Sequence, residues 1–262
     1  MIQLLNNTDI PLTLPMVLTV IIGIFLGSFM DAIAGGGGIV TVPTYVLAGL
    51  PMHMALGTNK LSATFGTFAS TMKYIRSGYV IWKLAVPALM VAMVGSSLGT
   101  RLQLMVDAKY LQSLLLFVLP VVAAVVLRQR SFPETSTPMP LGKQIAIIAI
   151  SSFFIGCYDG FYGPGTGTFM LVIFTRFAGL DIRSASGVAR AINFASTSGA
   201  MLTSVYYGQV FYLLALIGAV SALAGNLLGA DLVLRKGSVV VRPTVLIVLS
   251  LLALKVLSDM IL

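Results

Sequence analysis

Two basic residues lie inside apolar stretches of the sequence. Lys60 falls in the run Gly57-Thr-Asn-Lys-Leu61, and Arg190 falls in the run Gly187-Val-Ala-Arg-Ala191. Ionisable residues within membrane segments are costly, and they commonly mark a substrate or ion path. A guanidinium offers a planar pair of donors to an oxyanion. The pair therefore predicts an anion-binding site, although Lys60 could instead extend to the membrane surface.

Each basic residue follows a glycine-rich interruption of an apolar run. Irregular backbone at membrane depth is tolerated where it is buried in protein or lines a polar cavity. The helix that starts after such a break presents free N–H groups, which favour an anion. Close helix packing through small residues is the alternative. The predicted substrate-binding residues are Lys60, Arg190, Asn59, Thr58, Asn193, Gly35, Gly36, Gly37, Gly38, Gly163, Gly165, Thr166 and Gly167.

Two acidic residues occupy matching places at the start of the breaks, namely Asp31 and Asp159. Burial raises the pKa of a carboxyl group and a nearby cation lowers it. Either residue could therefore carry a proton or act as a fixed counter-charge. A structural alternative pairs each acid with the cation of its own half, Asp31 with Lys60 and Asp159 with Arg190.

The residues that most enzymes and metal sites need are scarce. The chain has one Cys, one His and one Glu, and no nucleotide-binding motif. We therefore expect no metal, no cofactor and no catalytic site, although a membrane-embedded enzyme stays as a remote alternative. The net charge of +8 is spread over short loops. That pattern fits the positive-inside bias of membrane proteins better than nucleic-acid binding.

Composition places the chain in a membrane. Its 262 residues are 58% hydrophobic and only 9% charged, whereas soluble domains carry roughly 25% charged residues. Long apolar runs without alternation predict helices and not a barrel.

The sequence also repeats itself. A shift of 130 residues superposes seven glycine pairs, where chance would give about one. They are Gly35/Gly165, Gly37/Gly167, Gly49/Gly179, Gly57/Gly187, Gly78/Gly208, Gly95/Gly225 and Gly99/Gly229. We predict an N-terminal repeat at 1–128, a cytoplasmic linker at 129–142 and a C-terminal repeat at 143–262.

Each repeat is expected to hold a broken helical hairpin and three transmembrane helices. The first hairpin has arms at 14–30 and 39–48, and the second has arms at 145–158 and 168–178, each arm being short for a full crossing. The longer spans are expected near 52–72, 83–104 and 110–127, and near 182–206, 211–232 and 241–261. Asp181 suits the N-cap of the span at 182–206.

The basic residues favour inverted over parallel repeats. If each hairpin enters and returns on one side, the halves must face opposite ways. This topology puts eleven of the sixteen Lys and Arg residues in the cytoplasm and both termini outside. A parallel repeat would place 1–15 inside and distribute the charges less well. The eleven are Lys73, Arg76, Lys83, Arg128, Arg130, Lys143, Arg176, Arg183, Arg235, Lys236 and Arg242.

Three segments resemble the TauE/SafE family of membrane permeases over residues 14–262. They are Asp31-Ala-Ile-Ala-Gly-Gly-Gly-Gly38, Gly57-Thr-Asn-Lys-Leu61 and Tyr158-Asp-Gly-Phe-Tyr-Gly-Pro-Gly-Thr-Gly167. The resemblance implies transport of sulfite, sulfonates or related organosulfur anions. It also implies that the glycine-rich segments with Asn59, Lys60 and Arg190 form the substrate region.

These expectations combine into a secondary transporter of the inner membrane. It would carry a small sulfur-containing anion, with export as the expected direction, by alternating access between inverted halves. An anion channel and a sulfonate uptake permease are the alternatives. The expected partners are the anion and the lipid bilayer, with no nucleic acid, and a homodimer is left open.

Overall fold

A computed structural model describes residues 12–107, 110, 133–241 and 243–244, and within them the chain is helical without strands. One pattern of helices occurs twice: 21 residues, then 10 or 11, then two helices of 24 or 25. The first set is α2 (Leu14–Ala34), α3 (Gly38–Leu47), α4 (Met52–Arg76) and α5 (Trp82–Met105). The second set is α7 (Leu141–Phe161), α8 (Thr166–Arg176), α9 (Ile182–Tyr206) and α10 (Tyr212–Lys236). The predicted all-α class is confirmed for the described residues.

Local sequence explains several helix ends. The Thr13 hydroxyl caps α2, and Pro15 lies in its first turn, where the missing N–H costs nothing. Asp181 caps α9 as predicted, because its carboxylate accepts two backbone N–H bonds at 3.0 Å. α2 ends at Gly35, whose φ of 74° suits glycine.

Both breaks begin later than predicted. α2 continues through Asp31, and α7 continues through Asp159. In the first break the run Asp-Ala-Ile-Ala contains no helix breaker, so α2 lasts until the first glycine. In the second break α7 passes through Gly160 and ends at Phe161. The first arm of each hairpin therefore has 21 residues, and the prediction of two short arms is wrong for that arm. α3 and α8 are short as expected, with 10 and 11 residues.

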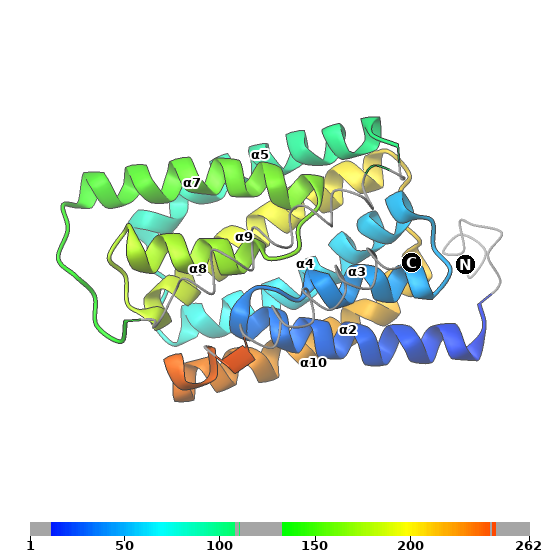
Figure 1. The fold of residues 1–262 in the computed structure, drawn as a ribbon, viewed down its shortest axis with the longest axis horizontal. Coiled ribbons are helices and arrows are strands. Elements are labelled where there is room, and N and C mark those ends of the chain that lie inside the picture. Colours follow the sequence, from blue (N-terminus) through cyan, green and yellow to red (C-terminus); the bar gives the residue numbers. More distant parts are fainter. Residues whose placement is uncertain (1–11, 108–109, 111–132, 242, 245–262) are drawn as a thin grey trace, which may run out of the picture.

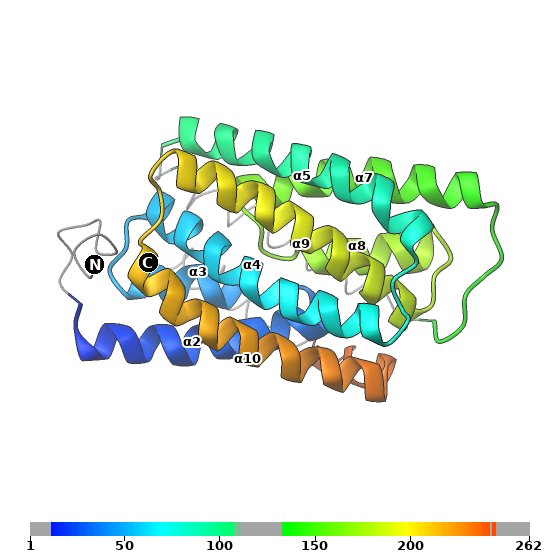
Figure 2. The same cartoon turned by 180° about the vertical axis from the view of Figure 1, so that it is seen from behind.

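The helices form a bundle in which the two sets interlock. Figures 1 and 2 show α4 and α9 through the middle, α2 and α10 along one side, and α5 and α7 along the other. α5 packs on α7 and α9, while α10 packs on α2 and α4. Each helix of the first set runs in the opposite direction to its counterpart in the second (Figure 1).

Four of the repeated glycines, Gly95, Gly99, Gly225 and Gly229, lie where helices of different sets cross. A Cβ added at Gly95 would lie 2.4 Å from Phe153 O, and one at Gly225 would lie 2.5 Å from Phe25 O. These two contacts are counterparts, because each pair of positions is related by the repeat. Glycine therefore allows the backbones of the two sets to approach closely. The same holds for Gly99 and Gly229, whereas Gly57 and Gly187 pack closely against the turns before α10 and α5.

The outer surface is apolar. α5 exposes a large hydrophobic side chain at every fourth position, on one stripe of the helix. Soluble proteins rarely expose continuous apolar patches of this kind. Four of the described helices, α2, α5, α7 and α10, are long and apolar enough to cross a membrane. The chain is therefore a multi-pass membrane protein. The exposed residues of α5 are Trp82, Val86, Met90, Val94, Leu98 and Leu102.

Some predicted elements lie outside the described residues. They include almost all of the spans at 110–127 and 241–261, most of the N-terminal tail and the first residues of the linker.

Candidate functional site

The two glycine-rich breaks cross at the centre of the protein. Gly167 donates its backbone N–H to Gly35 O at 3.1 Å, and the Thr168 hydroxyl donates to Ala34 O. A Cβ added at Gly35 would lie 2.2 Å from Gly167 C, and one added at Gly167 would lie 2.5 Å from Gly35 Cα. Close packing of the two backbones is therefore sufficient to explain these two glycines.

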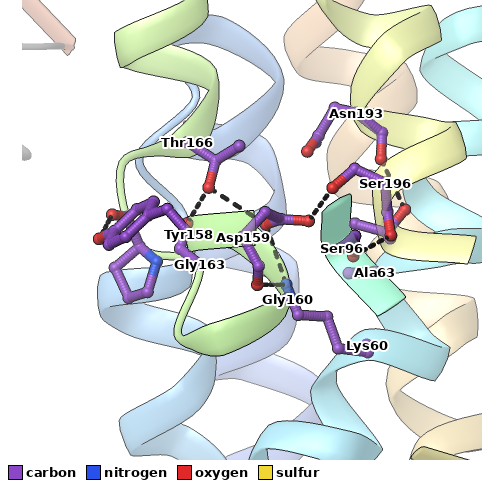
Figure 3. Close-up of polar contacts among 12 residues, drawn as sticks. Lys60, Ala63, Ser96, Tyr158, Asp159, Gly160, Gly163, Thr166, Asn193 and Ser196 are labelled. Atoms are coloured by element: carbon purple, nitrogen blue, oxygen red, sulfur yellow. Dashed lines mark hydrogen bonds and ion pairs between the residues drawn. The ribbon is translucent and has the colours of Figure 1, made fainter. Parts of the chain in front are cut away.

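Lys60 lies in the middle of α4 and reaches the end of α7 (Figure 3). Its Nζ donates to Asp159 Oδ1 at 2.9 Å and also to the Asp159 carbonyl oxygen. Asp159 Oδ2 accepts from the Ser196 hydroxyl at 2.7 Å, and Oδ1 lies 3.1 Å from the Thr166 hydroxyl. Both charged side chains are buried, with 6% and 5% exposed. The carboxylate thus has donors on both oxygens.

Arg190 makes the corresponding contact with the end of α2. Its NH1 group donates to Asp31 Oδ2 at 2.7 Å, and NH2 donates to the Asp31 carbonyl oxygen. The Gly37 N–H donates to Asp31 Oδ1 at 3.2 Å. The Arg190 side chain is 3% exposed, but that of Asp31 is 22% exposed. The acid of this second ion pair is therefore more exposed than the acid of the first.

The ion pairs join the two halves. Lys60 of the first half pairs with Asp159 of the second, and Arg190 pairs with Asp31. The pairing alternative drawn from sequence, within each half, is wrong. The partners are exchanged because the two breaks cross. The crossing brings each acid to the central helix of the other half.

A cavity of about 40 Å³ lies between the breaks and the central helices. Nine of the predicted residues line it, and six do not. Those that line it are Lys60, Asn59, Asn193, Gly37, Gly38, Gly163, Thr166, Asp31 and Asp159. Those that do not are Arg190, Thr58, Gly35, Gly36, Gly165 and Gly167. Arg190 lies behind Asp31, and the Thr58 hydroxyl instead accepts a hydrogen bond from Phe211 N at 3.0 Å.

Sequence reasoning missed several lining residues. Tyr162, Ser28, Thr41, Asn226, Thr67 and Thr197 line the cavity but were not among the predicted binding residues. Thr67 and Thr197 are related by the 130-residue shift, and their hydroxyl oxygens lie 3.2 Å apart. That symmetry could have identified them, whereas Asn226 corresponds to Ser96 and gave no signal.

Most other hydroxyls on the central helices do not line the cavity. Ser62, Thr64 and Ser70 donate to carbonyl oxygens of their own helix, which satisfies them without a ligand. No group of three or more His, Cys, Asp or Glu residues that could hold a metal ion occurs in the described part of the chain.

Comparison with known proteins shows the family to which the chain belongs. The family model of the sulfite exporter TauE/SafE matches residues 6–256. The chain belongs to the TauE/SafE family. It is 32% identical over 234 residues to a probable membrane transporter protein, ORF9, of a Sinorhizobium species, covering 88% of each chain. It is 33% identical over 234 residues to the probable membrane transporter protein YfcA of Escherichia coli K12, covering 88% of this chain and 86% of that one.

A probable membrane transporter protein of Haemophilus influenzae is 31% identical over 236 residues, covering 88% of this chain and 91% of its own. No solved structure matches the chain. Membership of the TauE/SafE family makes the chain a membrane transporter and not an enzyme, as expected from the sequence. A transporter of this family acts in a lipid bilayer on a small molecule.

Proposed function

We propose that the chain is a secondary transporter of a small sulfur-containing oxyanion, which binds in the central cavity and leaves the cytoplasm by alternating access. The observation that carries this proposal is the buried ammonium of Lys60 on the cavity wall. The direction and the sulfur chemistry rest on the family's description as a sulfite exporter.

The cavity suits a small anion. Its volume of about 40 Å³ corresponds to roughly three water-sized groups. Gly38 and Thr166, the first residues of α3 and α8, line it, so the positive ends of two helix dipoles lie beside it. Asn59 adds an amide, and Arg190 adds positive charge behind Asp31.

Alternating access would use the contacts between the halves. An anion that binds Lys60 competes with Asp159 for the same ammonium. Binding would therefore weaken one ion pair that joins the halves, and it would favour their relative movement. The halves in this proposal are 1–128 and 143–262, with the linker between them.

Inverted halves in the cytoplasmic membrane are part of the proposal. The opposite directions of matching helices support inversion (Figure 1). Eight basic residues at the ends of described helices gather at one end of the bundle, which would be cytoplasmic by the positive-inside bias. Both termini would then lie outside. The eight are Lys73, Arg76, Lys83, Lys143, Arg176, Arg183, Arg235 and Lys236.

Transport by purified protein in liposomes tests the function. We expect saturable uptake and counterflow with at least one of sulfite, sulfate, thiosulfate, taurine and sulfoacetate. Lys60→Gln should reduce the flux by about tenfold or more, because it removes a charged hydrogen-bond donor from the cavity. Lys73→Gln is the matched control, because Lys73 lies on the same helix but pairs with Asp231 outside the cavity.

The double variant Lys60→Gln/Asp159→Asn separates transport from folding, because it removes both charges of the pair and leaves neither one unpaired. Full flux in a folded Lys60→Gln protein would contradict the proposed site. Single-channel currents without counterflow would instead indicate a channel.

A further inference from the structure

The cavity contains more acceptors than an anion can use. The side-chain oxygens of Asn193 and Asn226 are buried and have no hydrogen-bond donor among the described residues. Both residues line the cavity, and they are 5% and 2% exposed. A buried amide oxygen without a partner has lost its hydrogen bonds to water and gained none in return, which is unfavourable. A sulfite dianion or a sulfonate group offers only acceptors, so it cannot satisfy these oxygens.

The orientation of Asn226 is fixed by its own helix. Its Nδ2 donates to Ala222 O at 3.2 Å. Turning the amide over would place two oxygens against each other and lose that bond. Its Oδ1 is therefore the atom left for a ligand.

Further oxygens lie on the same cavity wall. The Thr67 hydroxyl lies 2.9 Å from Ala63 O, and the Thr197 hydroxyl lies 2.9 Å from Asn193 O. When each donates its hydrogen to its own helix, the two hydroxyl oxygens face each other at 3.2 Å with lone pairs only. Asp31 adds a partly exposed carboxylate, shared with Arg190 and the Gly37 N–H.

The charge balance also calls for a cation. The cavity region holds two basic and two acidic side chains, which cancel as Lys60–Asp159 and Arg190–Asp31. An added anion would leave a net negative charge at membrane depth, and an uncompensated charge there is costly. A cation bound together with the anion would remove this cost, so each ligand would raise the affinity for the other.

We propose that the oxygens of Asn193, Asn226, Thr67, Thr197 and Asp31 form a site for Na⁺, which binds together with the transported anion. This inference rests on the proposed anion transport. Mostly neutral oxygens and one shared carboxylate suit a monovalent ion, since divalent ions require more negative ligands. The site gives the transporter a sodium gradient as its energy source.

Thermal unfolding of the purified protein in detergent tests Na⁺ binding before any anion is added. NaCl is compared with KCl and N-methylglucamine chloride at equal ionic strength. Na⁺ should raise Tm saturably, by about 2–4 °C at ten times its half-saturating concentration. Equal Tm in the three salts would overturn the Na⁺ site. A rise caused by lowering the pH, with none caused by Na⁺, would overturn it in favour of proton coupling.

Variants connect the Na⁺ response to the named oxygens. Asn226→Leu removes the amide oxygen at similar volume, and the Na⁺-dependent rise in Tm should disappear. Ser221→Ala is the matched control on α10, because its hydroxyl only approaches Ile217 O at 3.5 Å. Asn226→Asp keeps an oxygen and adds charge, so it should lower the half-saturating Na⁺ concentration. An unchanged Na⁺ response in both Asn226 variants would overturn the assignment.

A second titration separates this inference from the proposed function. Sulfite is added as its N-methylglucamine salt, with and without NaCl. The expected result is an increase in Tm that grows several-fold when Na⁺ is present. Equal stabilisation by sulfite with and without Na⁺ would overturn the coupling and leave anion binding intact. Stabilisation by Na⁺ but by none of the five anions would overturn the proposed function and leave the cation site intact.

Discussion

The two ion pairs occupy matching positions but differ in how closed they are. The Asp159 carboxylate is 5% exposed and has Lys60, Ser196 and Thr166 around it. The Asp31 carboxylate is 22% exposed, and within the described part of the chain it accepts hydrogen bonds from Arg190 and the Gly37 N–H. Ser196 corresponds to Gly66 by the 130-residue shift, which removes one donor from the Asp31 side. The repeated frame therefore holds one pair that is buried on both sides, called the closed pair, and one pair whose acid is partly exposed, called the open pair.

This difference suggests a division of work between the halves. The closed pair joins α4 to the end of α7, and in the proposed transport it would give way only when an anion binds Lys60. The open pair leaves a carboxylate beside the unpartnered oxygens of Asn193 and Asn226. Asymmetry at equivalent positions is what a site for two unlike ligands requires.

The largest effect is expected from removing the acid of the closed pair. Asp159→Ala leaves Lys60 buried without its counter-charge, and we expect a loss of about 3–5 kcal/mol of unfolding free energy. Asp31→Ala should cost less, about 1–3 kcal/mol, because the Asp31 carboxylate is already 22% exposed and has fewer hydrogen-bond donors around it than Asp159. Thermal unfolding of the purified variants measures both losses. Equal losses would remove the distinction between the two pairs.

A second comparison concerns the helix crossings that frame the pairs. A Cβ at Gly99 would lie 1.9 Å from Cys157 O, whereas one at the equivalent Gly229 would lie 2.6 Å from Phe29 O. Overpacking costs about 1–3 kcal/mol, and Gly99→Ala should fall at the upper end with Gly229→Ala below it. Gly142→Ala is the control, because nothing lies within 4 Å. The melting temperatures of the three variants measure these costs. A larger loss of stability in Gly229→Ala than in Gly99→Ala would contradict this ranking.

The repeat explains which features could be predicted from the sequence. Apolar runs predicted the helices, and the glycine pairs identified equivalent positions, because both signals are local or periodic. The pairing of Lys60 with Asp159 could not be predicted from local or periodic signals. Sequence spacing favours partners within one half, and only the crossing of the breaks exchanges them.

Asn226 shows a second limit. It lies on α10, far in sequence from both breaks, and its counterpart is Ser96, which donates to Ser196 O outside the cavity. Neither a motif nor the repeat identifies Asn226 as a cavity residue. Its role follows only from the packing of α10 against α4, which brings it to the cavity wall.

A smaller effect should come from the donor that only the closed pair has. Ser196→Ala removes the 2.7 Å hydrogen bond to Asp159 Oδ2, and hydrogen bonds to charged groups contribute about 1.5–3 kcal/mol. The loss should lie near the lower value, since Lys60 and Thr166 remain. Ser198→Ala is the matched control on the same helix, because Ser198 bonds only to Phe194 O. If Ser196→Ala and Ser198→Ala have equal unfolding free energies, the Ser196 hydroxyl does not stabilise the Lys60–Asp159 pair.

The smallest effect is expected from an ion pair outside the membrane segments, which shows what exposure does to such contacts. Glu134 accepts the Ser238 N–H at 2.9 Å and lies 3.3 Å from Arg183 NH1, with its side chain 45% exposed. The hydrogen bonds from Ser238, followed by the charge of Arg183, hold the pKa of Glu134 below its usual value. A carboxyl whose pKa is lowered by folding stabilises the protein above its unfolded pKa and loses that contribution as the pH falls through the folded value.

We therefore expect Glu134 to contribute at most a few tenths of a kcal/mol above about pH 5. This contribution should decrease as the pH falls through the lowered pKa of the folded state. Glu134→Gln should unfold slightly earlier than wild type at pH 7, and the difference should shrink as the pH is lowered into the acidic range. High salt should reduce the difference at pH 7, since it screens exposed charges, yet leave the effect of Asp159→Ala nearly unchanged. A salt-dependent Asp159→Ala penalty would mean that water reaches the Lys60 pair as readily as it reaches Glu134, and the closed pair would not be closed.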